Sequence, residues 1–487
     1  MIRLNSHVKR SFPRIRIPIG PPPNVNPSLR YSSHYARQYT ANQGRRNWSK
    51  IILTTLGGIS LIGFSAWWVY WPHHTFPKSV AKILRKALWA ESEKGEKDYS
   101  TALKHYLEAL EEADKLELDP LSDEYTGIQL KVGEMYERLN MNEHALMVYS
   151  EIASAYLDGL ITPNKIKIGD RPHIIQKDLR VVVKIVELNK SNPYNSKMLL
   201  MTHFMIAQEE VAKRSKVVSN MIKEEKERVL ADVANVGEVQ YTNPIKEDSM
   251  EVGKDEKVII LERNREAWEP FRDELFNARD LYVAICLATG DLQSAVRTKI
   301  ATTEWMLNAD CDPGEILMSQ TNLGSLMYLQ AEEFESKESR AIKQKLPDAM
   351  IEAERFNKQS CISLALRCYE SVLAFSKELP AQLRREENVE ESIALSTYGL
   401  GVVKLHLGEL EAAKNLLRES RLRAKGSGFS DLVNEAEREL EKLSKEVERL
   451  EKEGAKKESE EQRIKNLLSK GNDQPDIELD IQLSKHK

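Results

Sequence analysis

An uncharged stretch of 21 residues, from Ile51 to Trp71, constrains this chain more than any other feature. A helix of that length rises about 30 Å at roughly 1.5 Å per residue, which matches the hydrocarbon core of a bilayer. The stretch ends in Trp67, Trp68, Tyr70 and Trp71, and these side chains favour the membrane interface. It therefore predicts one transmembrane helix over 51–71. The alternative is a buried helix of a soluble domain.

Charge divides sharply along the chain. The first acidic residue is Glu91, and 14 of the 71 basic residues precede it. The remainder holds 57 basic and 75 acidic residues, a net charge of −18. A domain this acidic is a poor candidate for nucleic-acid binding, so no nucleic-acid partner is expected.

Residues 1–50 contain ten lysines and arginines and no acidic residue, as mitochondrial presequences do. A secretory signal would place its apolar run much nearer the N-terminus. The arginine of Arg37-Gln38-Tyr39 resembles sites cut by the mitochondrial processing peptidase. We therefore expect a presequence over 1–39 and a short matrix segment over 40–50. A disordered cytosolic tail is the alternative.

Basic residues flank the predicted span on both sides, so local charge decides its orientation poorly. They are Arg45, Arg46 and Lys50 before it, and Lys78, Lys82, Arg85 and Lys86 after it. Keeping the short basic end in the matrix is the simpler topology. It predicts a single-pass inner-membrane protein whose C-terminal domain faces the intermembrane space.

The remainder, about 80–450, has helical periodicity, almost no strand signals and an internal repeat. A small residue is followed twelve positions later by alanine, and a large residue comes four positions after that alanine. The spacing occurs at Ala90–Ala102, Gly133–Ala145 and Gly401–Ala413, with Tyr106, Tyr149 and Leu417 as the large residues. Small residues let two helices cross closely while the large side chain fills the groove beside them. Chance matching in a helical protein is the alternative.

Two further units depart from this spacing. Gly324 precedes its alanine, Ala365, by 41 residues, which indicates a charged insertion over about 331–358. Around Ala295, Val283 replaces the small residue and Lys299 replaces the aromatic one. Five units are thus expected, near 85–113, 126–155, 276–306, 317–375 and 394–423, with Gly408 in the last inter-helix turn.

Other segments lack the repeat. Residues 178–188 and 197–217 predict a degenerate hairpin, and 233–257 is polar and predicts a mobile loop. Ser430 and Asp431 can cap a final helix whose apolar stripe would cover the last repeat. The charged stretch 451–487 is typical of a disordered tail.

No residues suggest catalysis. Phosphate-loop, nucleophile-elbow and zinc-protease motifs are absent from the sequence, and its ten histidines show no paired ligand spacing. Cys286, Cys311, Cys361 and Cys368 lack metal spacing and are interpreted as small buried side chains. The chain is therefore not expected to be an enzyme or to need a metal or cofactor.

The fragments LKVGEMY, TNLGSLMY and YGLGVVKLHLGELEAAKNLL resemble tetratricopeptide units. The resemblance implies an all-α helix-hairpin solenoid, which would follow the single N-terminal transmembrane helix predicted over 51–71. The first helix of each unit would line its concave face. Candidate substrate-binding residues there are Tyr328, Tyr398, Val402 and His406, for which plain packing is the alternative.

A basic presequence, one span and divergent tetratricopeptide units before a charged tail resemble the fungal adaptor subunit of the mitochondrial inner-membrane i-AAA protease. The resemblance implies a non-catalytic adaptor that delivers unfolded or membrane-protein substrates for ATP-dependent degradation. Its implied partners are the membrane-bound protease, the other accessory subunit, unfolded polypeptides and the membrane. The alternative is a tetratricopeptide import receptor or chaperone-docking protein of the outer membrane. An enzyme on a helical scaffold has no residue in its favour.

Overall fold

The computed structural model describes residues 75–95, 97–234, 241–245, 249–252, 258–260, 263–445, 447–449 and 452. The predicted presequence, matrix segment and span lie outside the described residues, as does nearly all of the charged tail. In the part that is described, no helix is both long and apolar enough to cross a bilayer. The chain divides between Leu139 and Asn140 into two compact units.

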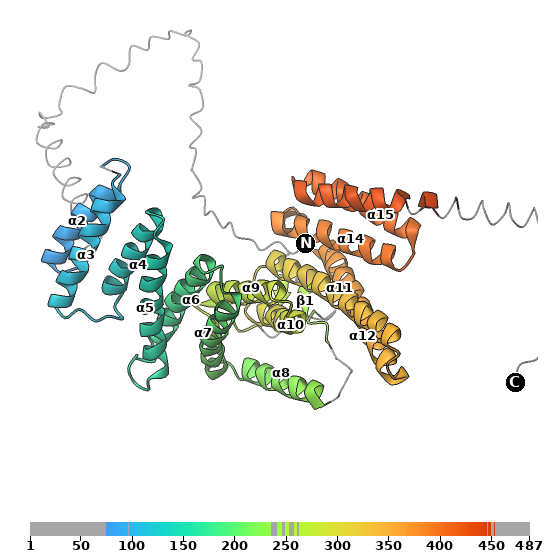
Figure 1. Ribbon diagram of the computed structural model, residues 1–487, viewed down its shortest axis with the longest axis horizontal. Helices are drawn as coiled ribbons and strands as arrows, with labels where there is room; N and C mark the ends of the chain where they lie inside the picture. Colours follow the sequence, from blue (N-terminus) through green and yellow to red (C-terminus); the bar gives the residue numbers. More distant parts are fainter. Residues whose placement is uncertain are drawn as a thin grey trace, which may run out of the picture. The chain divides into compact units, whose positions relative to one another are not determined.

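The first unit contains α2 (Lys78–Glu91), α3 (Tyr99–Lys115) and α4 (Asp123–Arg138), drawn in blue to teal in Figure 1. The Asp98 carboxylate accepts hydrogen bonds from two backbone N–H groups and caps α3, and the Ser122 hydroxyl caps α4. The three helices enclose a small core of Val80, Ala109, Ala113 and Ile128. Ala90 and Ala102, a pair with the twelve-residue spacing, are 2% and 0% exposed.

The second unit consists of helices, most of which pack against the next helix of the chain (Figure 1). Its first half contains α5 (Asn142–Ile161), α6 (Arg171–Leu188), α7 (Pro193–Arg214), α8 (Lys216–Ala234), η2 (Arg265–Ala267), α9 (Arg272–Ala288) and α10 (Leu292–Asn308). Its second half contains α11 (Pro313–Gln344), α12 (Asp348–Glu378), α13 (Ala381–Arg384), α14 (Glu387–His406) and α15 (Leu410–Gly426). Gly290 and Gly408 lie just after α9 and α14 at φ of 76° and 78°, a left-handed conformation that favours glycine.

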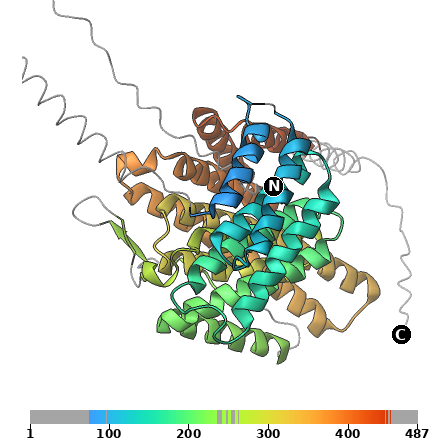
Figure 2. The ribbon, with the colours of Figure 1, turned by 90° about the vertical axis from the view of Figure 1, so that its left-hand side faces the viewer.

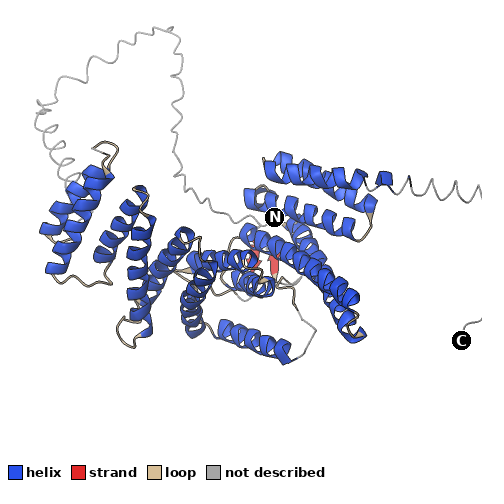
Figure 3. Ribbon diagram, in the orientation of Figure 1, coloured by secondary structure: helices blue, strands red, loops and turns tan. Residues whose placement is uncertain are grey.

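Two short strands interrupt the helices. β1 (Met250–Val252) pairs antiparallel with β2 (Val258–Ile260), and Met250 lies opposite Ile260. They are the only strands of the described residues (Figure 3) and stand out to one side of the unit in Figure 2. The sequence predicts a loop over 233–257 and no strand, because three-residue strands are too short to show an alternating pattern.

Long helices occupy the position of the predicted insertion. α11 and α12 have 32 and 31 residues and form an extended hairpin that turns at residues 345–347. Beyond α15, residues 430–445 form the final helix, whose Leu432 and Leu443 are buried against α14 and α15. The last hairpin therefore has its apolar face covered, as solenoid ends require.

Glycines mark the closest helix crossings. The buried ring of Tyr369 lies where a Cβ on Gly324 or on Gly399 would approach it to 2.7 or 2.3 Å. A Cβ on Gly401 would lie 2.9 Å from the Leu417 side chain, one turn after the buried Ala413. Gly133 and Ala145 are both buried, but they belong to different units. Ala365 is fully buried, one turn before Tyr369.

Candidate functional site

Two of the four predicted binding residues are in direct contact. The rings of Tyr328 on α11 and His406 on α14 lie 5.8 Å apart at an interplanar angle of 88°, an edge-to-face arrangement. The Tyr328 hydroxyl and the His406 Nδ1 are 3.5 Å apart. The His406 side chain keeps 26% of its surface exposed, and its Nε2 lies 3.8 Å from the Glu335 carboxylate. This pair is reachable from solvent.

Tyr398 and Val402 are placed differently. Both pack against the cluster formed by Ala413 and Leu417 of α15 and Leu443 of the final helix, and both are only partly buried. Acidic residues surround the tyrosines. Burial, reinforced by Glu332, Glu335 and Glu439, raises the pKa of Tyr328, and burial with Glu439 and Glu435 raises that of Tyr398. The four residues thus belong to one acidic, aromatic region where α11, α14 and the final helix meet.

A second apolar surface lies on α7. Tyr194, Met198, Met201 and Met205 are spaced by four, three and four residues and therefore share one helix face. Their exposed fractions are 67%, 61%, 38% and 49%. The opposite face of α7 is buried through Leu200, Phe204 and Ala207. Methionine side chains are flexible and polarizable, so such a surface adapts to apolar segments of different shape.

The periodicity of this methionine stripe is visible in the sequence, but its exposure is not. Both faces of α7 carry large apolar residues, so the pattern alone does not tell which face points inward. Packing decides it, because Phe204 meets Tyr282 of α9 edge to face at 5.3 Å.

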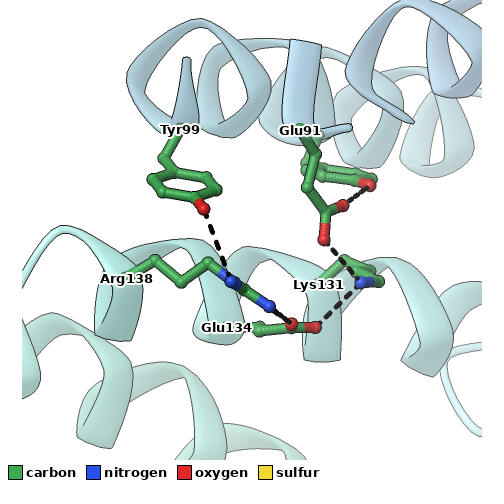
Figure 4. A network of polar contacts seen from close by, with 6 residues as sticks. Glu91, Tyr99, Lys131, Glu134 and Arg138 are labelled. Atoms are coloured by element: carbon green, nitrogen blue, oxygen red, sulfur yellow. Dashed lines mark hydrogen bonds and ion pairs between the residues drawn. The ribbon is translucent and has the colours of Figure 1, made fainter. Parts of the chain in front are cut away.

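The first unit holds a network of polar side chains (Figure 4). Lys131 of α4 donates hydrogen bonds to Glu91 (3.0 Å) and Glu134 (2.8 Å), and the buried Tyr106 hydroxyl donates to Glu91 (2.6 Å). Arg138 pairs with Glu134 at 3.0 Å. Burial pulls the pKa of Lys131 down, but the bonds to Glu134 and Glu91 outweigh it and the pKa is raised. The lysine stays charged and joins the end of α2 to α4, which is a structural role.

Buried polar groups also fill the middle of the second unit. Asp178 and His203 are 1% and 2% exposed, and their side chains lie 2.7 Å apart between α6 and α7. Burial raises the pKa of Asp178 against the opposing effect of His203. Arg279 is 3% exposed, with its guanidinium 4.1 Å from the Trp305 ring centre and 5.5 Å from that of Phe204. Burial lowers its pKa to about 10.

The cysteines, like the buried polar groups, are shielded from solvent. All four cysteines are buried and unpaired, and burial raises the thiol pKa to about 12 for Cys311, Cys361 and Cys368. Such thiols are protonated and unreactive at neutral pH. Among the described residues, no group of three or more His, Cys, Asp or Glu side chains is arranged to hold a metal ion.

Comparison with known proteins assigns the chain to a family. The family model of the MGR3 middle domain matches residues 163–311, which include α6 to α10. The mitochondrial inner membrane i-AAA protease supercomplex subunit MGR3 of Saccharomyces cerevisiae is 38% identical over 416 residues, which cover 81% of this chain and 83% of that protein. This chain belongs to the MGR3 family.

A second Saccharomyces cerevisiae protein of this family, described as MRG3-like, is 35% identical over 413 residues and covers 82% of this chain and 89% of its own. Among solved structures, the TPR2AB domain of yeast Sti1 in complex with pHSP90 is 10% identical and covers 75% of this chain and 98% of its own. Its TM-score is 0.21, too low to support a structural argument. The methionine stripe lies within the segment that the MGR3 family model matches.

Proposed function

We propose that this chain is a non-catalytic adaptor subunit of the i-AAA protease complex of the mitochondrial inner membrane. Residues 51–71 anchor it, and the helical hairpins, as divergent tetratricopeptide units, bind unfolded or membrane-protein substrates and deliver them for degradation. The 38% sequence identity to an inner-membrane protease subunit supports a location in the inner membrane and disfavours an import receptor of the outer membrane. Its partners in this proposal are the protease, the other accessory subunit, unfolded polypeptide and the membrane.

The observation that carries substrate binding is the exposed methionine stripe on α7. An adaptor must accept many clients, so its contacts have to be apolar and adaptable. Three neighbouring exposed methionines and Tyr194 provide such a surface. Affinity for each client is expected to be weak, in the micromolar range of about −8 kcal/mol. A shared membrane compensates, because tethering raises the effective concentration of client and protease.

A second surface contributes in this proposal. The partly exposed pair of Tyr328 and His406, with Tyr398 and Val402 beside it, offers aromatic contacts in acidic surroundings. It favours client segments that combine apolar and basic residues. The two surfaces can be separated by mutation because they lie on different helices.

Binding is tested with the full-length protein in nanodiscs and a labelled domain that unfolds when its ligand is withdrawn. We expect Kd for the unfolded form to be at least about tenfold lower than for the folded form. Met198→Ser with Met201→Ser should weaken binding severalfold. Met147→Ser is the matched control, because Met147 is 70% exposed on α5. Equal affinity for folded and unfolded forms would remove the adaptor role.

Topology is tested in intact mitochondria. Added protease should spare the C-terminal domain until the outer membrane is ruptured and should then digest it. Digestion in intact organelles would place the domain in the cytosol and overturn the inner-membrane assignment. Exchange of residues 51–71 for an unrelated span should leave client binding unchanged; loss of the protease from the complex would show that the helix itself is an interface.

A further inference from the structure

We propose that one face of α2 binds the anionic phospholipid headgroups of the membrane that holds the predicted span. The inference rests on the proposed membrane anchor and adds a second contact to it. Its basis is a cluster of cations and an exposed tryptophan on the first helix after the span. We call this cluster the basic face; it consists of Lys78, Lys82, Arg85, Lys86 and Trp89.

The basic face is a true helix face. At about 100° per residue, its five members fall within an arc of about 100°. The four cations are exposed, as is 59% of Trp89, whereas Val80, Ala87 and Ala90 turn inward to the unit's core. α2 contains no acidic residue before its last position, Glu91. The exposed surface of this helix therefore has one sign of charge.

The four cations also lack ion-pair and hydrogen-bond partners among the described residues. Within the described part of the chain, Lys78, Lys82, Arg85 and Lys86 form no ion pair or hydrogen bond through their side chains. The pKa of Glu108 is lowered mainly by its hydrogen bond with His105 and to a smaller extent by the nearby charge of Lys86. By contrast, Lys131 and Arg138 of the same unit are bound to carboxylates. Among the described residues, the basic face takes no part in the ion pairs that join the helices of this unit.

The short connection between the predicted span and α2 keeps the basic face close to the membrane. Six residues separate Trp71, the end of the predicted span, from Lys78. Even fully extended, they reach only about 20 Å. α2 is therefore held near the headgroups, whose negative potential attracts cations within a Debye length of about 8–10 Å. Because cations flank the span on both sides, those on α2 are not explained as an orientation signal.

Trp89 suits the same contact. An indole at the headgroup level buries its ring beside the acyl chains and keeps its N–H near water. At the interface the tryptophan supplies apolar contact and the four cations supply charge complementarity. Docking in this way would hold the first unit against the membrane surface instead of leaving it to swing on its tether.

The test uses the full-length protein in two kinds of nanodisc, phosphatidylcholine alone and phosphatidylcholine with about 20% phosphatidylglycerol. Lysine accessibility is measured by timed acetylation and mass spectrometry. We expect Lys82 and Lys86 to react about tenfold more slowly in the anionic discs, and the difference to vanish at about 1 M salt. Lys104, exposed on α3, is the control and should react equally in both.

Amide hydrogen exchange gives a second measurement. Exchange of α2 should slow in anionic discs for the native protein but not for Lys82→Gln/Arg85→Gln/Lys86→Gln, whose changes are all at exposed positions. Equal acetylation of Lys82 and Lys86 in both discs would overturn the proposal. A protein that does not stay in either disc would instead refute the predicted span, so the two failures are distinguishable.

Discussion

Two neighbouring hairpins place different residues at the same position of the repeat. In α11–α12, Tyr369 lies four residues after Ala365, and its ring contacts Gly324 and Gly399. In α9–α10, Lys299 lies four residues after Ala295, and its buried ammonium forms a 2.7 Å bond with Asp280. At this position, the α11–α12 hairpin packs an aromatic ring against glycines, whereas the α9–α10 hairpin forms an ion pair.

The difference extends beyond one position. The segment from α6 to α10 carries Asp178 with His203 and the buried Arg279, whereas α11 to α15 depends on glycines and alanines at helix crossings. Shape complementarity tolerates almost no change of volume, while a charge pair with one solvated partner tolerates more. The two halves should therefore respond differently to substitution.

The largest effect is expected from Tyr369→Ala. The ring is 2% exposed, and its loss leaves a cavity between α11, α12 and α14, at a cost of about 3–4 kcal/mol. Local stability is measured by amide hydrogen exchange in these helices. Tyr194→Ala, at a site that is 67% exposed, is the control and should cost less than about 0.5 kcal/mol.

A graded glycine series should follow. Gly399→Ala would bring a methyl group 2.3 Å from the Tyr369 ring and should cost about 2 kcal/mol in α14. Gly401→Ala meets the more flexible Leu417 side chain at 2.9 Å and should cost less. Gly426→Ala, in open space on α15, should be neutral or slightly stabilising. Equal effects of all three would show that close crossings do not govern this half.

Apart from the control substitutions, Lys299→Met should have the smallest effect. The methionine keeps most of the buried stem, and the freed Asp280 is 42% exposed and can be hydrated, so we expect a loss below about 1 kcal/mol in α10. Lys299→Ala, which also removes the stem, should cost more. A loss from Lys299→Met as large as that from Tyr369→Ala would erase the distinction between the two hairpins.

This comparison explains what could be predicted from the sequence. Small residues recur at a fixed spacing because helix crossings demand them, so Gly324, Gly401 and the turn at Gly408 are recognisable. Gly399 escapes the rule because its partner, Tyr369, belongs to another unit of the repeat. The final helix over 430–445 is visible in its apolar stripe.

Buried polar pairs obey no such spacing. Asp178 and His203 are 25 residues apart, and Arg279 meets Trp305 across a hairpin, so no periodic signal joins them. The binding surfaces depend on exposure, which packing decides. Tyr398 and Val402, expected on a concave face, are partly buried against Ala413, Leu417 and Leu443. The methionine stripe is likewise recognised only once α7 is packed.

We propose that this chain delivers clients to the inner-membrane protease. The most direct test of this proposal is the half-life of an inner-membrane client with an unfolded domain, measured by pulse–chase in mitochondria that lack this chain and in mitochondria in which it has been restored. We expect a severalfold longer half-life without the chain, restored by the native protein and by Met147→Ser but not by Met198→Ser with Met201→Ser. An unchanged half-life in its absence would contradict the adaptor role.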